Sequence, residues 1–150
     1  MKATGVVRRI DDLGRVVIPK EIRKTLRIKE GDPLEIFTDR EGQVILKKYS
    51  PIGELSEFAA GYAETLSKTT GHIACITDKD TIIAVSGGSK KEFLEQDIST
   101  ELERLMEDKE IYTSKDNSDV SMPITKNDNK ERKYNAQVVY PIISNGDTIG

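Results

Sequence analysis

The chain has 150 residues, of which 36% are hydrophobic and 33% charged, and its formal net charge is −3 at pH 7. This length and hydrophobic content suit one domain or two small ones. The sequence has neither an apolar run of signal-peptide type nor a stretch near 18 apolar residues, so we expect a cytoplasmic protein with no membrane association.

Positive charge is concentrated in the first third of the chain. Residues 1–50 carry twelve Lys and Arg against eight Asp and Glu, a net charge of +4, whereas residues 51–150 carry eleven against eighteen, a net charge of −7. The overall sequence pI of about 5.3 argues against a generally basic protein. Any site for a polyanion is therefore expected in the N-terminal part.

The first expected elements are two short strands, Val6–Ile10 and Val16–Ile18. The sequence DDLGR joins them, and Gly14 can take the positive φ that such a turn requires. Arg15 is then presented at the tip of the loop.

A short basic helix is expected after Pro19, from Lys20 to about Ile28. At helical spacing one stripe is cationic and the opposite one apolar, the cations being Lys20, Arg23, Lys24 and Arg27. A basic helix face is usually only a solvated surface. Here the charge is segregated, and arginine, which can bind phosphate or guanine with two donors at once, outnumbers lysine between residues 8 and 27. We therefore expect double-stranded DNA as the partner.

A second hairpin is expected from Leu34–Thr38 and Gln43–Lys48, joined by DREG with Gly42 at a left-handed position. The resulting β-β-α-β-β unit, residues 1–50, is too small to bury its own apolar residues and has no disulfide or metal set to stabilise it. Dimerisation is the remaining option. Lys47 and Lys48, on the closing strand, are expected to contribute little to DNA binding.

The run TGVVRRIDDLGRVVIPKEIRKTLRIKEGDPLEIF, followed by GQVILKKY, resembles the AbrB-type DNA-binding domain of the swapped-hairpin fold. The resemblance implies that two chains interleave their hairpins into one dimeric β-barrel. It also implies DNA contacts from cations of the loop and helix, which fall here on Arg8, Arg15, Arg23 and Lys24. Arg9 and Lys20 are further candidates that could equally be solvated neighbours.

Residues 51–54 are expected to form a linker to a second domain, residues 55–150. Its first helix carries an apolar stripe and ends at Gly71; the stripe consists of Leu55, Phe58, Ala59, Tyr62 and Leu66. We favour packing of this stripe within its own domain. Packing against the same helix of a second chain, which would turn dimers into tetramers, is the alternative.

The remaining elements alternate between strands and helices. They are strands at 72–77, 81–86 and 136–143, helices at 91–96 and 100–108, a long loop at 116–135 and a turn at 144–147. Thr100 and Glu103 match a capping box, and Gly87-Gly88 reads as a tight turn rather than an anion site.

This pattern resembles a GAF domain, and two runs, CITDKDTIIAVSGGSKK and VVYPIISNGDTIG, are similar to the second half of AbrB-family regulators of late spore development. The resemblance implies a sensory or oligomerising role and an unidentified small-molecule ligand. A GAF domain continues beyond this turn with another strand and a helix, so we expect the domain to be incomplete at Gly150.

No catalytic constellation is recognisable. Cys75 and His72 are the only residues of their kinds and lie in one alternating apolar segment, where a buried inert thiol is expected. The chain lacks a phosphate-binding loop of the GxxxxGK[ST] type. We therefore expect an α+β protein without cofactor or enzymatic activity, acting as a homo-oligomeric transcription regulator. The alternative is the antitoxin of a toxin–antitoxin pair.

Overall fold

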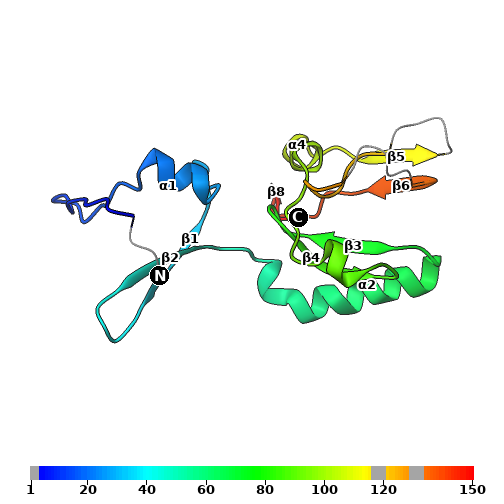
Figure 1. The fold of residues 1–150 in the computed structure, drawn as a ribbon, viewed down its shortest axis with the longest axis horizontal. Helices are drawn as coiled ribbons and strands as arrows, with labels where there is room; N and C mark the ends of the chain where they lie inside the picture. The colour runs from blue at the N-terminus through cyan, green and yellow to red at the C-terminus, as the bar shows by residue number, and fades with distance from the viewer. Residues whose placement is uncertain (1–3, 116–120, 129–133) are drawn as a thin grey trace. The chain divides into compact units, whose positions relative to one another are not determined.

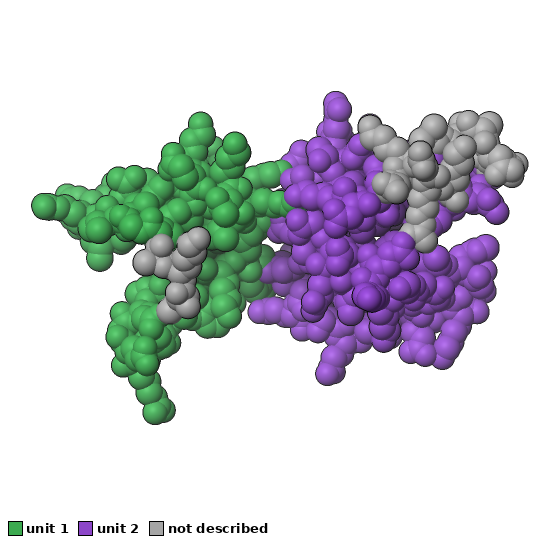
Figure 2. All heavy atoms as spheres, viewed as in Figure 1, with its two compact units in different colours: residues 1–49 green, residues 50–150 purple. Residues whose placement is uncertain are grey.

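The structure is a computed structural model that describes residues 4–115, 121–128 and 134–150. The chain divides into two compact units, Met1–Tyr49 and Ser50–Gly150 (Figures 1 and 2). Both contain helices and strands, which confirms the mixed class. The segment expected as a linker leads into a short 3₁₀ turn, η1 (Gly53–Leu55).

The first unit contains one helix and one hairpin. The helix is α1 (Lys20–Thr25), and the antiparallel strands are β1 (Leu34–Thr38) and β2 (Val44–Lys48). The loop between the strands has Gly42 at φ +82°, as its sequence predicted. The second expected hairpin is therefore confirmed, with β2 beginning one residue later than predicted.

The helix ends before the residue that periodicity indicated. Arg27 takes a left-handed conformation with φ +53° and donates its N–H to the main-chain oxygen of Lys24. The N–H of Ile28 reaches back to the oxygen of Arg23 at 2.8 Å, which completes a Schellman-type stop. The expected helical span to Ile28 was thus wrong, and Arg27 does not belong to the cationic stripe of the helix.

The two strands expected before the helix are not formed within residues 4–19 of one protomer. Val7, Ile10 and Val17 are 88%, 69% and 70% exposed. The segments on either side of the 11–15 loop, residues 4–10 and 16–19, are called the two arms below. They are joined at the loop, where the N–H of Asp11 donates to the main-chain oxygen of Arg15. Strands require a paired neighbour. Within residues 4–49 the sheet of this unit consists of β1 and β2, so one protomer does not by itself make a barrel.

In the second unit, α2 (Ser56–Thr70) packs on the hairpin of β3 (Ala74–Thr77) and β4 (Ile82–Ser86). The buried side chains of this contact are small, with Ala59 and Ala63 of the helix against Ala84 of β4, and the half-buried Ile76 and Ile83 pack beside them. Small residues let a helix approach a strand pair closely because little side-chain volume separates the backbones.

The apolar stripe expected to pack within its domain lies largely on the other side of α2. Ala59 is buried, but the large members are exposed by 56%, 65%, 56% and 45%, in the order Leu55, Phe58, Tyr62 and Leu66. The favoured interpretation was therefore wrong for the large side chains. The helix buries its alanine face because only that face can come close to the strands.

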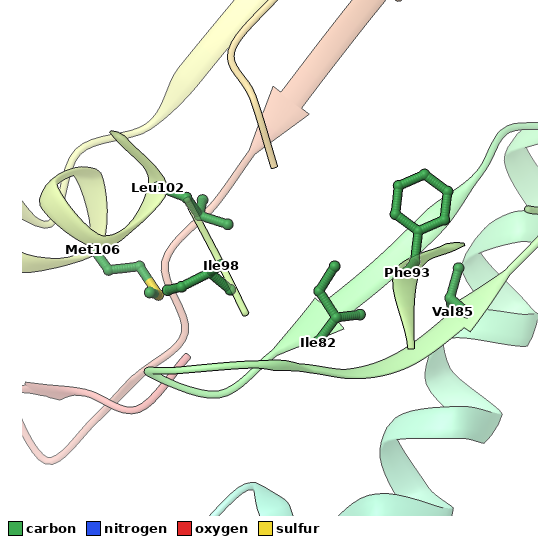
Figure 3. Packing of buried hydrophobic residues seen from close by; sticks show 6 residues of the cluster. All are labelled: Ile82, Val85, Phe93, Ile98, Leu102 and Met106. Atoms are coloured by element: carbon green, nitrogen blue, oxygen red, sulfur yellow. The ribbon is translucent and has the colours of Figure 1, made fainter. Parts of the chain in front are cut away.

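The main core of the second unit is formed where the second strand of this hairpin meets two later helices, α3 (Lys90–Phe93) and α4 (Thr100–Asp108) (Figure 3). Its buried side chains are Ile82, Val85, Phe93, Ile98, Leu102 and Met106. The bounds of α4 agree with the prediction, whereas α3 is shorter than the expected 91–96.

The cap of α4 differs from the predicted capping box. The Ser99 Oγ accepts the N–H of Leu102 at 3.0 Å, so Ser99 is the N-cap and Thr100 is the first helical residue. The same hydroxyl donates to the main-chain oxygen of Pro123 at 2.6 Å. Residues 121–128, which belong to the expected long loop at 116–135, are thereby attached to the helix. Residues 116–120 and 129–133 of that loop lie outside the described residues.

Two further antiparallel pairs lie in the described part of the second unit. β5 (Tyr112–Lys115), which the sequence did not indicate, pairs with β6 (Ala136–Val139). β7 (Ile143–Ser144) and β8 (Asp147–Thr148) form a minimal hairpin. The expected strand at 136–143 is therefore interrupted, and Pro141, between β6 and β7, has no N–H to donate to a ladder.

Candidate nucleic-acid interface

The loop at residues 11–15 is built by a single carboxylate. The Oδ1 atom of Asp11 accepts the N–H groups of Leu13 at 3.0 Å and Arg15 at 2.8 Å. The N–H of Gly14 donates to the main-chain oxygen of Asp11 at 3.0 Å, with Gly14 at φ +75°. These bonds hold a tight loop that presents Arg15 near its tip.

The same carboxylate also holds the arginine side chain. The Arg15 Nε lies 2.8 Å from the second oxygen of Asp11, Oδ2, and the side chains are 70% and 37% exposed. The main-chain N–H of Arg15, followed by its guanidinium, lowers the pKa of the Asp11 carboxyl, and the N–H of Leu13 adds to this effect. Asp11 therefore stays ionised beside Arg15 over the physiological pH range.

The start of α1, the helix that carries three of the predicted cations, is fixed by the residues just before it. Pro19 precedes α1 with φ −57° and is buried, and the Arg23 Nε donates to the main-chain oxygen of Ile18 at 3.2 Å. Arg23 and Lys24 lie in the last turn, where the helix dipole favours positive charge.

All six predicted DNA-binding residues are exposed in the protomer, and they come from three pieces of the first unit. The first arm carries Arg8 and Arg9, the loop carries Arg15, and the helix carries Lys20, Arg23 and Lys24. Exposure gives a polyanion access to each of them.

Lys48, which the sequence led us to expect would contribute little to DNA binding, has a structural role. Its ammonium donates to the main-chain oxygen of Arg27 at 3.0 Å and lies 3.7 Å from the Asp32 carboxylate, which itself accepts the N–H of Lys29 at 2.8 Å. Its neighbour Lys47 instead lies over the ring of Phe37, 4.8 Å from the centroid. Lys48 thus ties the end of α1 to the hairpin.

The first unit buries almost nothing within one protomer. In the described range 4–49, Pro19 is the single buried residue. Large apolar side chains are exposed both before α1 and in the β1–β2 hairpin, among them Val7, Leu13, Ile36 and Val44. Exposed large apolar side chains in such number are typical of an interface with another chain.

The thiol of Cys75, in β3 of the second unit, is held in its protonated form. Burial raises the pKa of the Cys75 thiol to about 11, and the nearby Asp128 charge contributes in the same direction. A thiol with such a pKa is protonated at neutral pH and is a poor nucleophile. Across the described residues of the whole chain, no group of three or more His, Cys, Asp or Glu side chains is placed to hold a metal ion.

The helices within the described ranges are short or polar. None of them combines the length and the apolar character that crossing a membrane requires.

Two family models match the chain. One, described as stage V sporulation protein T C-terminal, transcription factor, matches residues 54–150. The other, described as antidote-toxin recognition MazE, bacterial antitoxin, matches residues 7–54. Because the first match covers more than half of the chain, the chain belongs to the stage V sporulation protein T family of transcription factors.

Individual relatives agree with this family. Stage V sporulation protein T of Bacillus subtilis (strain 168) is 56% identical over 150 residues, which are 100% of this chain and 82% of that protein. Transition state regulatory protein AbrB of the same organism is 63% identical over 51 residues, 34% of this chain and 52% of that protein.

Two solved structures of AbrB are also similar to part of the chain. The solution structure of the N-domain of the transcription factor abrB has 63% sequence identity, covers 34% of this chain and 96% of its own, and superposes with a TM-score of 0.32. The N-terminal DNA recognition domain of Bacillus subtilis AbrB has 61% identity, with 34% and 94% coverage and a TM-score of 0.30.

Proposed function

We propose that this chain is a DNA-binding transcription regulator in which the first unit contacts double-stranded DNA and the second controls assembly. The single observation that carries the proposal is the set of exposed cations on the first arm, the 11–15 loop and α1, in a chain whose other residues are net negative. Segregated charge of this kind attracts a polyanion to one unit and keeps the rest of the chain away from it. A regulator of transcription acts on the chromosome, which in a bacterium lies in the cytoplasm.

Within this function, Arg8, Arg15, Arg23 and Lys24 are the proposed DNA contacts. Arginines on the loop and helix can bind phosphate or guanine with two donors, whereas Lys24 offers a point charge. Arg9 and Lys20 are proposed as weaker contributors.

The first unit is proposed to act as an obligate dimer, in which two copies interleave their hairpins into one barrel. The support is the exposure of its apolar side chains and the lack of pairing for its first two arms within residues 4–19. Pairing with a second copy would give the arms their hydrogen-bonding neighbours and would bury the apolar residues in one step.

The second unit is proposed to be a GAF-like domain that takes an unidentified small molecule and pairs dimers into tetramers. The exposed face of α2 supports the second of these roles. The rings of Phe58 and Tyr62 lie there in a tilted arrangement, 5.3 Å between centroids, while both side chains remain mostly solvent-exposed.

The antitoxin alternative draws on the match of residues 7–54 to an antitoxin family model. It is less well supported, because the remaining two thirds of the chain match a transcription-factor family. An antitoxin would need a toxin as its partner, and residues 54–150 would have to provide the surface that binds it.

The test compares the full chain with a fragment of residues 1–53 by light scattering and by DNA binding at several salt concentrations. We expect the fragment to be a dimer that binds DNA. Four cations per chain allow about eight contacts per dimer, so affinity should fall steeply with salt. A folded monomer at micromolar concentration, or binding that is insensitive to salt, would overturn the proposal.

A further inference from the structure

Two loops of the first unit, residues 11–15 and residues 39–43, use the same construction. The Oδ1 of Asp39 accepts the N–H groups of Glu41 at 3.0 Å and Gln43 at 2.8 Å, as the Oδ1 of Asp11 does for Leu13 and Arg15. In both loops a glycine three residues after the aspartate has a positive φ and donates to the aspartate main-chain oxygen. One carboxylate oxygen is therefore sufficient to build this loop.

The second oxygen distinguishes the loops. The Oδ2 of Asp11 accepts from the Arg15 Nε at 2.8 Å. In the other loop the residue at the matching position, Gln43, donates instead to the Glu41 carboxylate at 3.0 Å. Asp11 thus has a contact that the construction of the loop does not require.

The contact leaves a specific edge of the guanidinium available. It engages Nε, and within the described residues the hydrogen bond of the Arg15 guanidinium is made by this nitrogen and not by the terminal Nη1 or Nη2. These two nitrogens form the end of the planar fork, an edge that can donate two parallel bonds to a phosphate or to a guanine. A guanidinium held at Nε also loses less rotational freedom when it binds.

We propose that Asp11 is a positioning residue that holds the Arg15 guanidinium by Nε so that its terminal edge is oriented for DNA. This rests on the proposed function, in which Arg15 contacts DNA. The low pKa of Asp11 is consistent with a carboxylate that remains charged for this purpose.

A positioning role for Asp11 and simple charge repulsion by Asp11 predict opposite changes in DNA affinity when this carboxylate is neutralised. A carboxylate near DNA repels phosphate, so neutralising it without other consequence should strengthen binding. If Asp11 orients Arg15, neutralising it should weaken binding, because the side chain must then be ordered at the moment of contact.

The decisive variant is Asp11→Asn in the full chain. Asparagine keeps an oxygen for the N–H groups of Leu13 and Arg15, but places an amide where Oδ2 accepted from Nε. Asp39→Asn is the matched control, with the same change of charge in a loop of the same construction. We expect Asp11→Asn to weaken DNA binding about 2- to 10-fold, in the range of one net hydrogen bond, and Asp39→Asn to leave it unchanged.

Coupling to Arg15 separates positioning from loop damage. In an Arg15→Ala background, measured at low salt so that binding persists, Asp11→Asn should cause no further weakening. The Nε–H signal of Arg15 in the NMR spectrum of the free protein should be distinct in the natural chain and broadened in Asp11→Asn. Weakening that persists without Arg15, or binding that strengthens in Asp11→Asn, would overturn the positioning role.

The salt dependence tests the underlying function separately. Arg15→Ala should reduce the slope of log affinity against log salt by about 0.9 for each phosphate that the arginine neutralises, whereas Asp11→Asn should leave this slope unchanged. If Arg15→Ala changes neither affinity nor slope, then the assignment of Arg15 to the DNA face is what fails.

Discussion

The Lys48 ammonium lies 3.0 Å from the main-chain oxygen of Arg27, the residue that ends α1 in a left-handed conformation. The bond joins the last strand of the first unit to the end of the helix that carries Arg23 and Lys24. The side chains of Lys48 and its ion-pair partner Asp32 are only 27% and 15% exposed. A partly buried charged donor on a main-chain oxygen contributes more than a surface ion pair does.

We therefore expect Lys48→Ala to lower the free energy of unfolding by about 1 kcal/mol. Contrary to the expectation from the sequence, it should also weaken DNA binding, by displacing α1. Lys47→Ala is the control, since Lys47 lies over an aromatic ring on the same strand. Thermal unfolding should be measured at one protein concentration for all variants, because the stability of an assembled protein depends on concentration. Equal behaviour of the two variants would contradict the role of Lys48.

Alanine substitution should rank the proposed DNA contacts by the size of their effect on DNA affinity. Arg15→Ala and Arg23→Ala should abolish most DNA binding while the protein stays folded and assembled, because neither side chain is buried. Arg8→Ala and Lys24→Ala should have smaller effects. Binding to a short duplex, followed by fluorescence anisotropy, measures this; damage from Lys47→Ala as severe as that from Arg15→Ala would show that the DNA face is misplaced.

The exposed face of α2 should determine the size of the assembly. Changing Phe58 and Leu66 together to glutamate should split the proposed tetramer, keep the dimer, and weaken binding to long DNA more than to one short site. Lys68→Glu is the control, since it makes the same change in net charge on another face of the same helix. Unchanged mass by light scattering in a folded double variant would exclude this mechanism.

The Cys75 thiol should be unreactive in the native protein. With a pKa of about 11, roughly one thiol in a thousand is ionised at pH 8, whereas an unfolded thiol with a pKa near 8.5 is about a quarter ionised. The reaction with a thiol-specific disulfide reagent should accordingly be slow in buffer and fast in denaturant.

The sign of the pH effect on stability follows from the same shift. The native state holds this proton more tightly than the unfolded state, so the contribution of Cys75 to the free energy of unfolding declines as pH rises from about 8.5 to about 11. Rapid modification of the native protein at pH 8 would show that the thiol is not shielded by the packing around β3.

Local signals predicted the second hairpin and the span of α4 well. The DREG turn and the alternation around it place β1 and β2 within one residue, because a tight turn fixes the register of the strands that it joins. The exposure of the predicted DNA-binding cations was also anticipated, although their role in binding stays a prediction.

The errors occurred where partners outside the local sequence decide the outcome. Helical periodicity could not reveal that Arg27 would leave α1, since a left-handed stop usually has glycine at this position. The α2 stripe was misassigned because apolar periodicity predicts that a helix face is buried but does not identify the surface against which it packs. The part of Asp11 in building its loop could have been found from the recurrence of Asp-x-x-Gly at Asp39.

That Pro19 alone is buried in the range 4–49 also bears on how such a regulator responds to its own abundance. In the proposed dimer, folding and pairing of the first unit are one event, so the amount of binding-competent protein rises with the square of the chain concentration while chains are scarce. Doubling the number of chains then gives about four times the active species. A gradual change in synthesis would thereby become a sharper change in promoter occupancy, without any ligand or modification.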